Sequence, residues 1–393
     1  MTAHQEDKSK WYHIEGELWK VDEITMKALD ILEGVNRTNQ YHHENIQVIH
    51  KDNNNIKNND LVIMDEYNIQ NNDDIIMDEY LTKYINHISK TFSNQNNLNE
   101  FINQIKFSYD WTISNMLCFP VNIGNEQGII MKKSHSDKEG YFGFLNIDKR
   151  KENSLLWSKL VEIASKNNIK KLSGPIQGST YFPYRFVSYS NGMNFFKGEF
   201  FSMPSENDYI LSFKPDNIIN YKSAVREDFN EILKITQPTY NKLIEKGLKI
   251  EVLKNPDLDF YKEIYQITNI TFADNWGYEN LSFEEFIKFV KTKESNQSRL
   301  SLQKITFRDK LVGFSKYDDE SDDTIIFKTA AILPQFQKMG IGIAIAYKGH
   351  EDAIELGYKK AIYALVRFNN RVDRMPQPDL VNFREYSSYE FNI

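Results

Sequence analysis

Cysteine and long apolar runs are almost missing from this chain of 393 residues. Its single cysteine, Cys118, can form neither an intramolecular disulfide nor a thiolate metal site, and its apolar neighbours predict a buried, inert thiol. No apolar run approaches the roughly 18 residues that span a bilayer, and the polar N-terminus lacks the apolar core of a signal peptide. We therefore expect a reduced, cytoplasmic protein with no membrane span.

Positive charge is also in deficit, because 48 Lys and Arg residues face 55 Asp and Glu residues, which gives a formal net charge of −7. A nucleic-acid partner usually requires a basic face, so we expect none. The eight histidines show no metal-ligand spacing. His42 and His43 are adjacent but stand alone in a polar stretch, so we predict no metal. Apolar bulk is plentiful, with 40% hydrophobic and 13% aromatic residues, and the length predicts two or three domains.

Residues 52–97 are rich in asparagine and contain a short internal repeat. The segment NNDLVIMDEY at Asn58–Tyr67 recurs as NNDDIIMDEY at Asn71–Tyr80. Seven acidic residues and no Lys or Arg occur from Asn58 to Thr82. Two interpretations stay open, an acidic docking segment and a replicated insertion that serves as a linker.

The chain from Leu248 onward shows the clearest order of elements. A capping box of Ser282 and Glu285 opens one helix, and Gly357 ends the next. Earlier in the chain, residues 141–150 are typical of a strand and 152–168 of an amphipathic helix. The C-terminal pattern predicts a strand at 248–253, helices at 258–272 and 281–293, a meander of strands at 302–307, 311–318 and 324–333, a helix at 342–356, and strands at 360–368 and 382–392.

The junction between the meander and the following helix carries Gln337–Gly342, which fits the pattern Gln/Arg-x-x-Gly-x-Gly/Ala. A tight turn there exposes successive backbone N–H groups at the positive end of a helix dipole. Gly340 and Gly342 lack Cβ atoms, so a pyrophosphate can approach the backbone closely, and Lys338 adds a positive charge. The segment therefore predicts a phosphate-binding loop.

This combination resembles the GNAT superfamily of acyl-CoA N-acyltransferases. The segment FKTAAILPQFQKMGIG at residues 327–342 looks like the strand-loop-helix core of a two-lobed GNAT-like family, in which KT-x-x-x-LP-x-x-Q-x-x-G-x-G is typical. FADNWGYENLSFEEF (Phe272–Phe286) and LSGPIQGSTYFPYRFV (Leu172–Val187) resemble segments of that family's second and first lobes. The resemblance implies an α/β (α+β) fold of tandem lobes, each a mixed central sheet flanked by helices.

The resemblance also implies where the acyl donor binds. In this superfamily, backbone N–H groups of the fourth strand hold the thioester carbonyl and the pantetheine, and the loop holds the pyrophosphate. The implied donor is acetyl-CoA or a longer acyl-CoA, with an acyl carrier protein as the alternative. The implied donor-binding residues are Ala331, Ile332, Leu333, Gln337, Lys338, Met339, Gly340, Ile341, Gly342 and Asn370.

The first lobe has no glycine in the corresponding loop, Lys149–Ser154, so we expect it to contribute half of the substrate cleft. The stretch from Tyr181 to Arg185 either lines that cleft or packs as an aromatic loop between the lobes. The predicted substrate-binding residues are Tyr181, Tyr184, Arg185, Asn275 and Trp276.

Catalysis requires a group that accepts the amine proton and a group that protonates the leaving thiolate. The sequence departs from the superfamily here, because the fourth strand has no acidic residue after Asp323 and residues 369–379 contain no tyrosine. The candidate acids are Tyr386 and Tyr389, and the candidate bases are Glu279 and Asp274. Proximity and a water relay are the alternative, since a thioester is already activated.

Residues 15–50 look like the back half of a γ-glutamylcyclotransferase-like domain. The match places that family's catalytic glutamate on Glu33, which would shuttle the proton as an α-amine attacks a γ-amide. The family's Tyr-Gly-Ser/Thr-Leu loop is missing from the chain, so we interpret this part as a truncated relic or a structural appendage.

These observations predict four parts and one leading function. The parts are a small β-rich fragment at 1–51, an acidic linker at 52–97, a degenerate GNAT-like lobe at 98–247 and an acyl-CoA-binding GNAT lobe at 248–393. The predicted function is transfer of an acyl group to a primary amine of a small molecule or peptide, by direct attack on the thioester between the lobes. The alternatives are a cyclotransferase-type relic that uses Glu33 and a non-catalytic CoA-binding scaffold.

Overall fold

The computed structural model describes two short N-terminal strands and then the chain from residue 66, with gaps at 94, 134–135, 137, 148–154, 294–297 and 370–378. Strands β1 (Lys10–Ile14) and β2 (Glu17–Val21) form an antiparallel pair. They belong to a compact unit of residues 1–79, and residues 80–393 form a second compact unit. Glu33 lies outside the described residues, so the cyclotransferase assignment stays a prediction.

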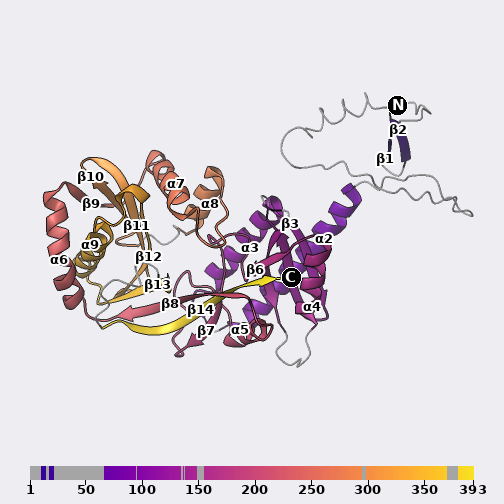
Figure 1. Ribbon diagram of the computed structural model, residues 1–393, viewed down its shortest axis with the longest axis horizontal. Coiled ribbons are helices and arrows are strands. Elements are labelled where there is room, and N and C mark those ends of the chain that lie inside the picture. The colour runs from indigo at the N-terminus through magenta and orange to yellow at the C-terminus, as the bar shows by residue number, and fades with distance from the viewer. Residues whose placement is uncertain are drawn as a thin grey trace, which may run out of the picture. The chain divides into compact units, whose positions relative to one another are not determined.

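The second unit holds the elements that build the candidate site (Figure 1). Helix α2 (Glu66–Thr91) begins in the first unit and ends in the second. The following elements are α3 (Leu98–Asn115), β3 (Leu117–Ile123), β4 (Glu126–Lys132), β5 (Glu139–Asn146), α4 (Leu156–Lys166), β6 (Lys171–Gly174), β7 (Phe186–Ser190), α5 (Pro204–Leu211), β8 (Asn217–Arg226), α6 (Asn230–Glu245), β9 (Leu248–Leu253), α7 (Leu258–Phe272), α8 (Phe283–Lys293), β10 (Leu302–Phe307), β11 (Lys310–Asp319), β12 (Thr324–Ile332), a 3-10 turn (Pro334–Phe336), α9 (Ile341–Glu355), β13 (Lys360–Arg367) and β14 (Val381–Asn392).

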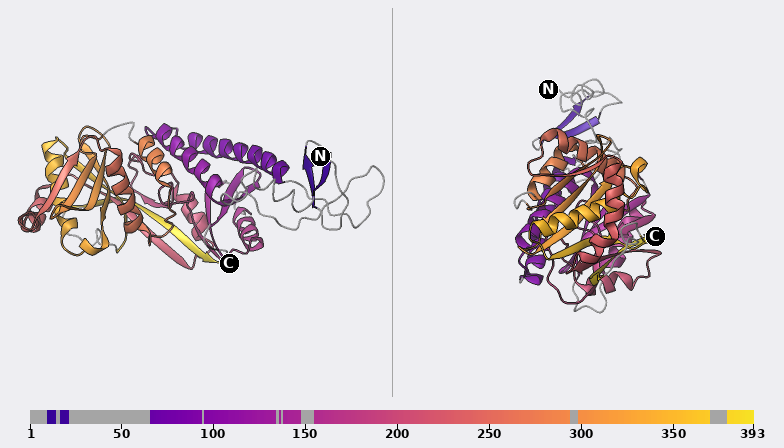
Figure 2. Two further views of the ribbon diagram at one scale, coloured as in Figure 1. Left: turned by 90° about the horizontal axis from the view of Figure 1, so that it is seen from above. Right: turned by 90° about the vertical axis from the view of Figure 1, so that its left-hand side faces the viewer.

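We call the part of this unit before residue 248 its first half and the part from residue 248 onward its C-terminal half. Within the described residues, both halves share one mixed sheet of twelve strands. The order is β3-β4-β5-β6-β14-β8-β13-β12-β11-β10-β9, and β7 pairs with β14 as well. Strand β14 pairs antiparallel with β8 along Val381–Glu390 and with β6 along Tyr389–Asn392. The last strand of the chain therefore lies at the centre of the sheet and runs from one half into the other (Figures 1 and 2).

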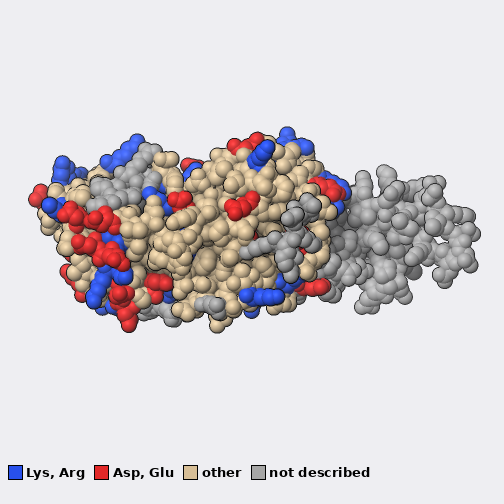
Figure 3. All heavy atoms as spheres, turned by 90° about the horizontal axis from the view of Figure 1, so that it is seen from below, with Lys and Arg blue, Asp and Glu red and all other residues tan. Residues whose placement is uncertain are grey.

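Helices cover the sheet on both sides, which confirms the expected α/β class. Helices α6 and α9 pack together against β9 and β12, and α7 packs against β11 and β12. Figure 1 shows α6 and α9 on one side of β9–β12 and α7 with α8 on the other. On the face drawn in Figure 3, charged side chains gather at the left end, the end that holds β9–β12, and they are sparse over the middle.

The elements predicted from residue 248 onward agree with the structure to within a few residues. The capping box is present, because the Ser282 N–H donates to Glu285 Oε2 (2.7 Å) and the Glu285 N–H donates to Ser282 Oγ (3.2 Å). Gly357 follows α9 with φ of 87°, as a helix C-terminal glycine does. Regular local patterns therefore account for this half of the fold.

The division into domains stays a prediction, but two observations bear on its boundaries. Helix α2 covers residues 66–91, inside the predicted linker, and buries Tyr80, Tyr84 and Ile88, one on each turn. Strand β8 and helix α6 precede residue 248, yet they contact β13 and α9 of the C-terminal half.

Further expectations concern Cys118, membrane spans and metal sites. Cys118 is half-buried rather than buried, and desolvation raises the pKa of its thiol to about 12. Among the described helices none combines the length and apolar character that a bilayer crossing needs. The same part of the chain contains no group of three or more His, Cys, Asp or Glu side chains arranged to hold a metal ion.

A buried ion pair joins β14 to the loop that precedes α5. The Arg384 guanidinium lies 2.5 Å from a Glu199 carboxylate oxygen, and the two side chains are 1% and 0% exposed. The Tyr386 hydroxyl donates to the other Glu199 oxygen and lies 3.0 Å from Ser223 Oγ on β8. These contacts satisfy a charge pair that would otherwise be costly to bury.

We predict that Glu199→Gln lowers the free energy of unfolding by about 3 to 5 kcal/mol, because Arg384 then stays buried without its counter-charge. Urea denaturation measures the change. Glu162→Gln, which alters an exposed pair with Lys166, serves as the control and should leave the midpoint unchanged. Combining Glu199→Gln with Arg384→Met should restore part of the loss, and a midpoint equal to wild type for Glu199→Gln alone would contradict the prediction.

Candidate active site

Strands β12 and β13 part in the middle of the sheet. They pair in parallel only from Thr324–Lys360 to Phe327–Tyr363. Beyond that point β13 pairs with β8 alone, and β12 pairs with β11 alone. The backbone edges of the two strands are therefore unpaired toward each other over their C-terminal halves.

A β-bulge sits on each strand where the two part. On β12, Lys316 lies opposite Thr329 and Tyr317 opposite Phe327, so Lys328 is the extra residue. On β13 the register with β8 shifts between Tyr363 and Val366, and Leu365 has a φ of 58°. Bulges bend a strand and re-aim its side chains, and they often occur beside active sites.

The exposed edge of β12 presents two backbone N–H groups. The Leu333 N–H donates to the Val312 carbonyl oxygen (2.9 Å) on β11. Because hydrogen-bonded residues alternate along an antiparallel pair, the Ala331 N–H faces β11 as well. The N–H groups of Ala330 and Ile332 therefore face the gap toward β13. Of the three predicted carbonyl-binding residues, Ile332 has a suitably directed N–H.

The loop after β12 leads into α9 and leaves several donors unused. Gly340 caps α9 with φ of 91°, a left-handed conformation that favours glycine. Within the part of the chain that the structure describes, no acceptor is found for the backbone N–H groups from Lys338 to Gly342. The Gln337 side chain donates to the Ile332 carbonyl oxygen (2.8 Å) and so ties the loop to the strand. A Cβ on Gly342 would approach only the tip of Ile332, at 3.9 Å, so space is open beside this helix end.

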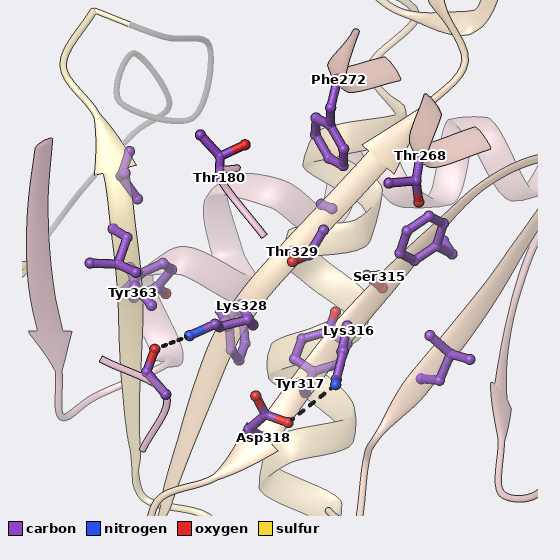
Figure 4. A pocket seen from close by; sticks show the side chains of 18 of the residues that line it. Thr180, Thr268, Phe272, Ser315, Lys316, Tyr317, Asp318, Lys328, Thr329 and Tyr363 are labelled. Carbon is purple, nitrogen blue, oxygen red and sulfur yellow. Dashed lines mark hydrogen bonds and ion pairs between the residues drawn. The ribbon is translucent and has the colours of Figure 1, made fainter. Parts of the chain in front are cut away.

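A cavity of about 530 Å³ opens between these elements. Residues of both parted strands line it, Lys328–Ala330 from β12 and Ala364–Val366 from β13. Aromatic and apolar side chains of α7 and α8, including Ile264, Phe272 and Phe286, form much of another wall. Figure 4 shows Thr268 and Phe272 at one end, Lys316, Tyr317 and Asp318 at the other, and Lys328 between the strands.

The structure brings some of the predicted binding residues to this cavity. Trp276 is not one of its lining residues. The indole N–H of Trp276 donates to Glu390 (3.2 Å), and its ring contacts Tyr184. Asn370 lies outside the described residues. The predicted residues that line the cavity are Tyr181, Tyr184, Arg185, Asn275 and Gly342.

The predicted acids and bases lie elsewhere, and their catalytic roles stay predictions. Tyr386 is engaged with Glu199 and Ser223, and the Tyr389 hydroxyl donates to the Asn207 side chain. Both tyrosines are 1% exposed within the sheet.

The two predicted bases differ in their surroundings. Asp274 is exposed. Glu279 is 5% exposed, and its carboxylate accepts from the Tyr141 hydroxyl (2.8 Å). The Ser179 hydroxyl donates to the backbone carbonyl of Glu279 and accepts from its backbone N–H. Glu279 therefore joins the two halves of the unit, and neither carboxylate lines the cavity.

Arg185 is a buried charge among the predicted substrate-binding residues. Its side chain is enclosed by the rings of Tyr184 and Tyr221, whose centroids lie 3.6 Å and 4.0 Å from the guanidinium carbon. Burial lowers its pKa to about 10, so the group stays charged at neutral pH. Its φ of 73° is in the left-handed region, a strained conformation that clusters at ligand-binding sites.

A buried group that sequence reasoning missed lies at the wall formed by α9. His350 is 0% exposed, and its Nδ1 lies 2.5 Å from the Ala346 carbonyl oxygen. Its Nε2 lies against the Tyr363 hydroxyl, whose oxygen accepts from Arg226 (3.1 Å). Burial lowers the pKa of His350 to about 3, so the imidazole is neutral. Nothing in the local pattern distinguishes this histidine from an ordinary helix residue.

A scan of protein-family models and a search of curated proteins find no match. Among solved structures, the chain is similar to a tandem GNAT protein from the clavulanic acid biosynthesis pathway, with TM-score 0.45, 8% identity, and coverage of 80% of this chain and 94% of that one. A conserved protein of unknown function from Enterococcus faecalis V583 gives TM-score 0.46, 9% identity, and coverage of 79% and 69%. A GCN5-related glucosamine N-acetyltransferase region in a fungal multi-domain GH3 β-N-acetylglucosaminidase gives TM-score 0.40, 12% identity, and coverage of 70% of this chain and 31% of that one, so the chain spans about a third of that protein. Similarity at this level says nothing about substrate or activity.

We predict that His350 makes folding less favourable as the pH falls. Its folded pKa of about 3 lies below the unfolded value of about 6.5, so between these values the unfolded chain binds a proton that the folded chain does not. Between pH 6 and pH 5, wild type should lose about 1 kcal/mol more unfolding free energy than His350→Gln. Urea denaturation at the two pH values measures this difference, and equal losses in both proteins would show that folded His350 takes up the proton.

Proposed function

We propose that the chain is an N-acyltransferase that moves an acyl group from acyl-CoA to a primary amine of a small molecule or peptide. Acetyl-CoA or a longer acyl-CoA is the proposed donor, and an acyl carrier protein presents the same phosphopantetheine thioester as the alternative donor.

The parting of β12 and β13 is the observation that carries this proposal. An extended pantetheine chain needs a slot with free backbone donors, and paired strands offer none. The slot between these strands has the N–H groups of Ala330 and Ile332 on its edge and the unused donors of Lys338–Gly342 beyond its end. A pyrophosphate and a thioester carbonyl thus find donors in the order in which they occur along CoA.

The loop residues fit the donor's phosphates in chemistry and in space. Helix N-termini with free N–H groups favour anions. Gly342 has open space on the side where a Cβ would project, and Lys338 adds positive charge. Gly340 has a different role, because its positive φ sets the turn that aims the helix.

The chemistry requires the amine nitrogen to form a bond to the thioester carbonyl carbon while the carbon–sulfur bond breaks. The thioester supplies an activated carbonyl. One of the two N–H groups, that of Ala330 or that of Ile332, stabilises the negative charge that develops on its oxygen, and the cavity walls from α7 and α8 keep bulk water out. The amine loses one proton, and the leaving thiolate gains one. Because the predicted acids and bases lie outside the cavity, orientation of the amine against the thioester supplies most of the acceleration, with water carrying the proton.

We predict that wild type binds CoA and acetyl-CoA in isothermal titration calorimetry and that Gly342→Trp does not. The indole would fill the open space beside the first turn of α9. Ile354→Trp, on the exposed side of the same helix, is the matched control and should bind like wild type.

Circular dichroism of all three proteins checks that they are folded. Absence of binding by wild type at millimolar CoA would contradict CoA as the donor, and a phosphopantetheinylated carrier protein would be titrated next. Equal binding by wild type and Gly342→Trp would contradict the assignment of the loop.

A further inference from the structure

The cavity is positively charged in a protein whose net charge is −7. Among the described residues that line it, six are Lys or Arg and two are Glu or Asp. Both carboxylates already have partners, because Asp318 lies 3.8 Å from Lys316 Nζ and Glu100 accepts from Gln104 (3.3 Å). The positive residues are Arg185, Lys197, Lys222, Arg226, Lys316 and Lys328.

Arg185 is a buried cation without a counter-charge. Its residue is 5% exposed, and among the described residues no carboxylate lies within ion-pair distance. Its NH1 donates weakly to the Leu365 carbonyl oxygen (3.4 Å), and its buried Nε has no acceptor. Glu199, which interacts with it electrostatically, is bound to Arg384 and Tyr386 instead. The stacked tyrosine rings offset part of the desolvation cost, but neutral rings leave the charge in place.

Lys328 is a second cation that lines the cavity, and it occupies the β12 bulge. Its Nζ donates to the Gly198 carbonyl oxygen (2.8 Å), a neutral acceptor. A Cβ on Gly198 would lie 2.9 Å from this Nζ, and the φ of 70° at Gly198 also requires glycine. Burial lowers the pKa of Lys328, and the charges of Lys316 and Arg185 lower it further, while Asp318 opposes them. The two cations share one region of the cavity, because Arg185 donates to Leu365 just past the last β12–β13 pair, Phe327–Tyr363, and Lys328 follows that pair on β12.

A binding site for a ligand anion explains both cations. A desolvated charge that lacks a partner is costly, and a bound anion would supply charge-assisted hydrogen bonds to both groups. We propose that the amine acceptor carries an anionic group, a carboxylate or a phosphate, that binds to Arg185 and Lys328. This inference rests on the proposed acyl transfer, and it names the class of acceptor.

The position of the two cations separates them from the donor's phosphates. Lys328 lies where β12 and β13 begin to part. The end of β12 is four residues, or about 13 Å, further along the strand, and the donor loop follows it. Arg185 reaches the same starting point from the first half, through Leu365. An anionic group held here leaves the acceptor's amine free to point along the slot toward Ala330.

The test uses probes that differ only in the anionic group, because the acceptor is unidentified. Phenylacetate, phenyl phosphate and neutral phenylacetamide suit a cavity lined by phenylalanine side chains such as Phe286 and Phe289. We expect at least one of the two anions to bind to wild type in calorimetry and to raise its melting temperature, and phenylacetamide to do neither. The anion that binds distinguishes a carboxylate acceptor from a phosphate acceptor.

Two variants locate the binding, and one controls for loss of charge. Arg185→Met and Lys328→Met should each weaken the anion by about tenfold or more, as loss of a charge-assisted hydrogen bond does. Lys249→Met, which removes an exposed lysine paired with Asp309, should bind the anion like wild type. If Arg185→Met does not fold, Lys328→Met alone decides, because its half-buried side chain lies at a strand edge.

Equal binding of phenylacetamide and the anions, no binding of either anion by wild type, or wild-type anion affinity in both variants would overturn the proposal. Titration of the same proteins with CoA separates it from the proposed function. Anion binding at Arg185 without any CoA binding would leave the anion site standing while acyl-CoA transfer fails. A parallel loss of CoA and anion affinity in Arg185→Met would assign the cations to the donor and so overturn the acceptor proposal.

Discussion

Strand β14 is the constraint on which both halves of the second unit depend, because neighbouring strands bind it along both edges. Its Arg384 is paired with Glu199, and its Tyr386 lies against Ser223. Ser223 Oγ also accepts the N–H of Leu365 (3.0 Å) at the β13 bulge. A continuous set of contacts therefore connects the buried ion pair to the point where the slot opens, and the last residues of the chain hold the site's geometry.

Local sequence patterns predicted the elements of the C-terminal half well, because each pattern reflects a nearby physical cause. The apolar spacing of Leu258–Phe272, the Ser282–Glu285 capping box and the glycine after α9 act within one or two helical turns. The strand, turn and helix start around Gln337–Gly342 are of the same kind because they are contiguous, while phosphate binding by this loop stays a prediction. Helix α2 was missed, since asparagine-rich composition concealed a stripe of Tyr80, Tyr84 and Ile88 that is apolar only on one face.

The candidate site was predicted less completely, because its residues meet only through the tertiary fold. Tyr386 and Tyr389 were candidate acids on the basis of residue type and position in the terminal strand, beyond the fifth strand. No local signal shows that β14 lies at the centre of a sheet covered on both sides, where both tyrosines are buried. Lys328 lay inside the recognised motif but was read as strand, because its role depends on a bulge that appears only in the pairing with β11.

Several departures from local rules occur together at the cavity. Arg185 and Leu365 adopt positive φ without being glycine, and Lys328 interrupts a strand ladder. The guanidinium of Arg185 is buried, and no carboxylate of the described residues forms an ion pair with it. Each departure costs free energy that the surrounding structure must offset. If these positions served stability alone, ordinary substitutions would remove the costs. An apolar side chain in place of Arg185 is one example. The coincidence of these departures at the parting of β12 and β13 is therefore the strongest physical argument that this region was shaped by a ligand.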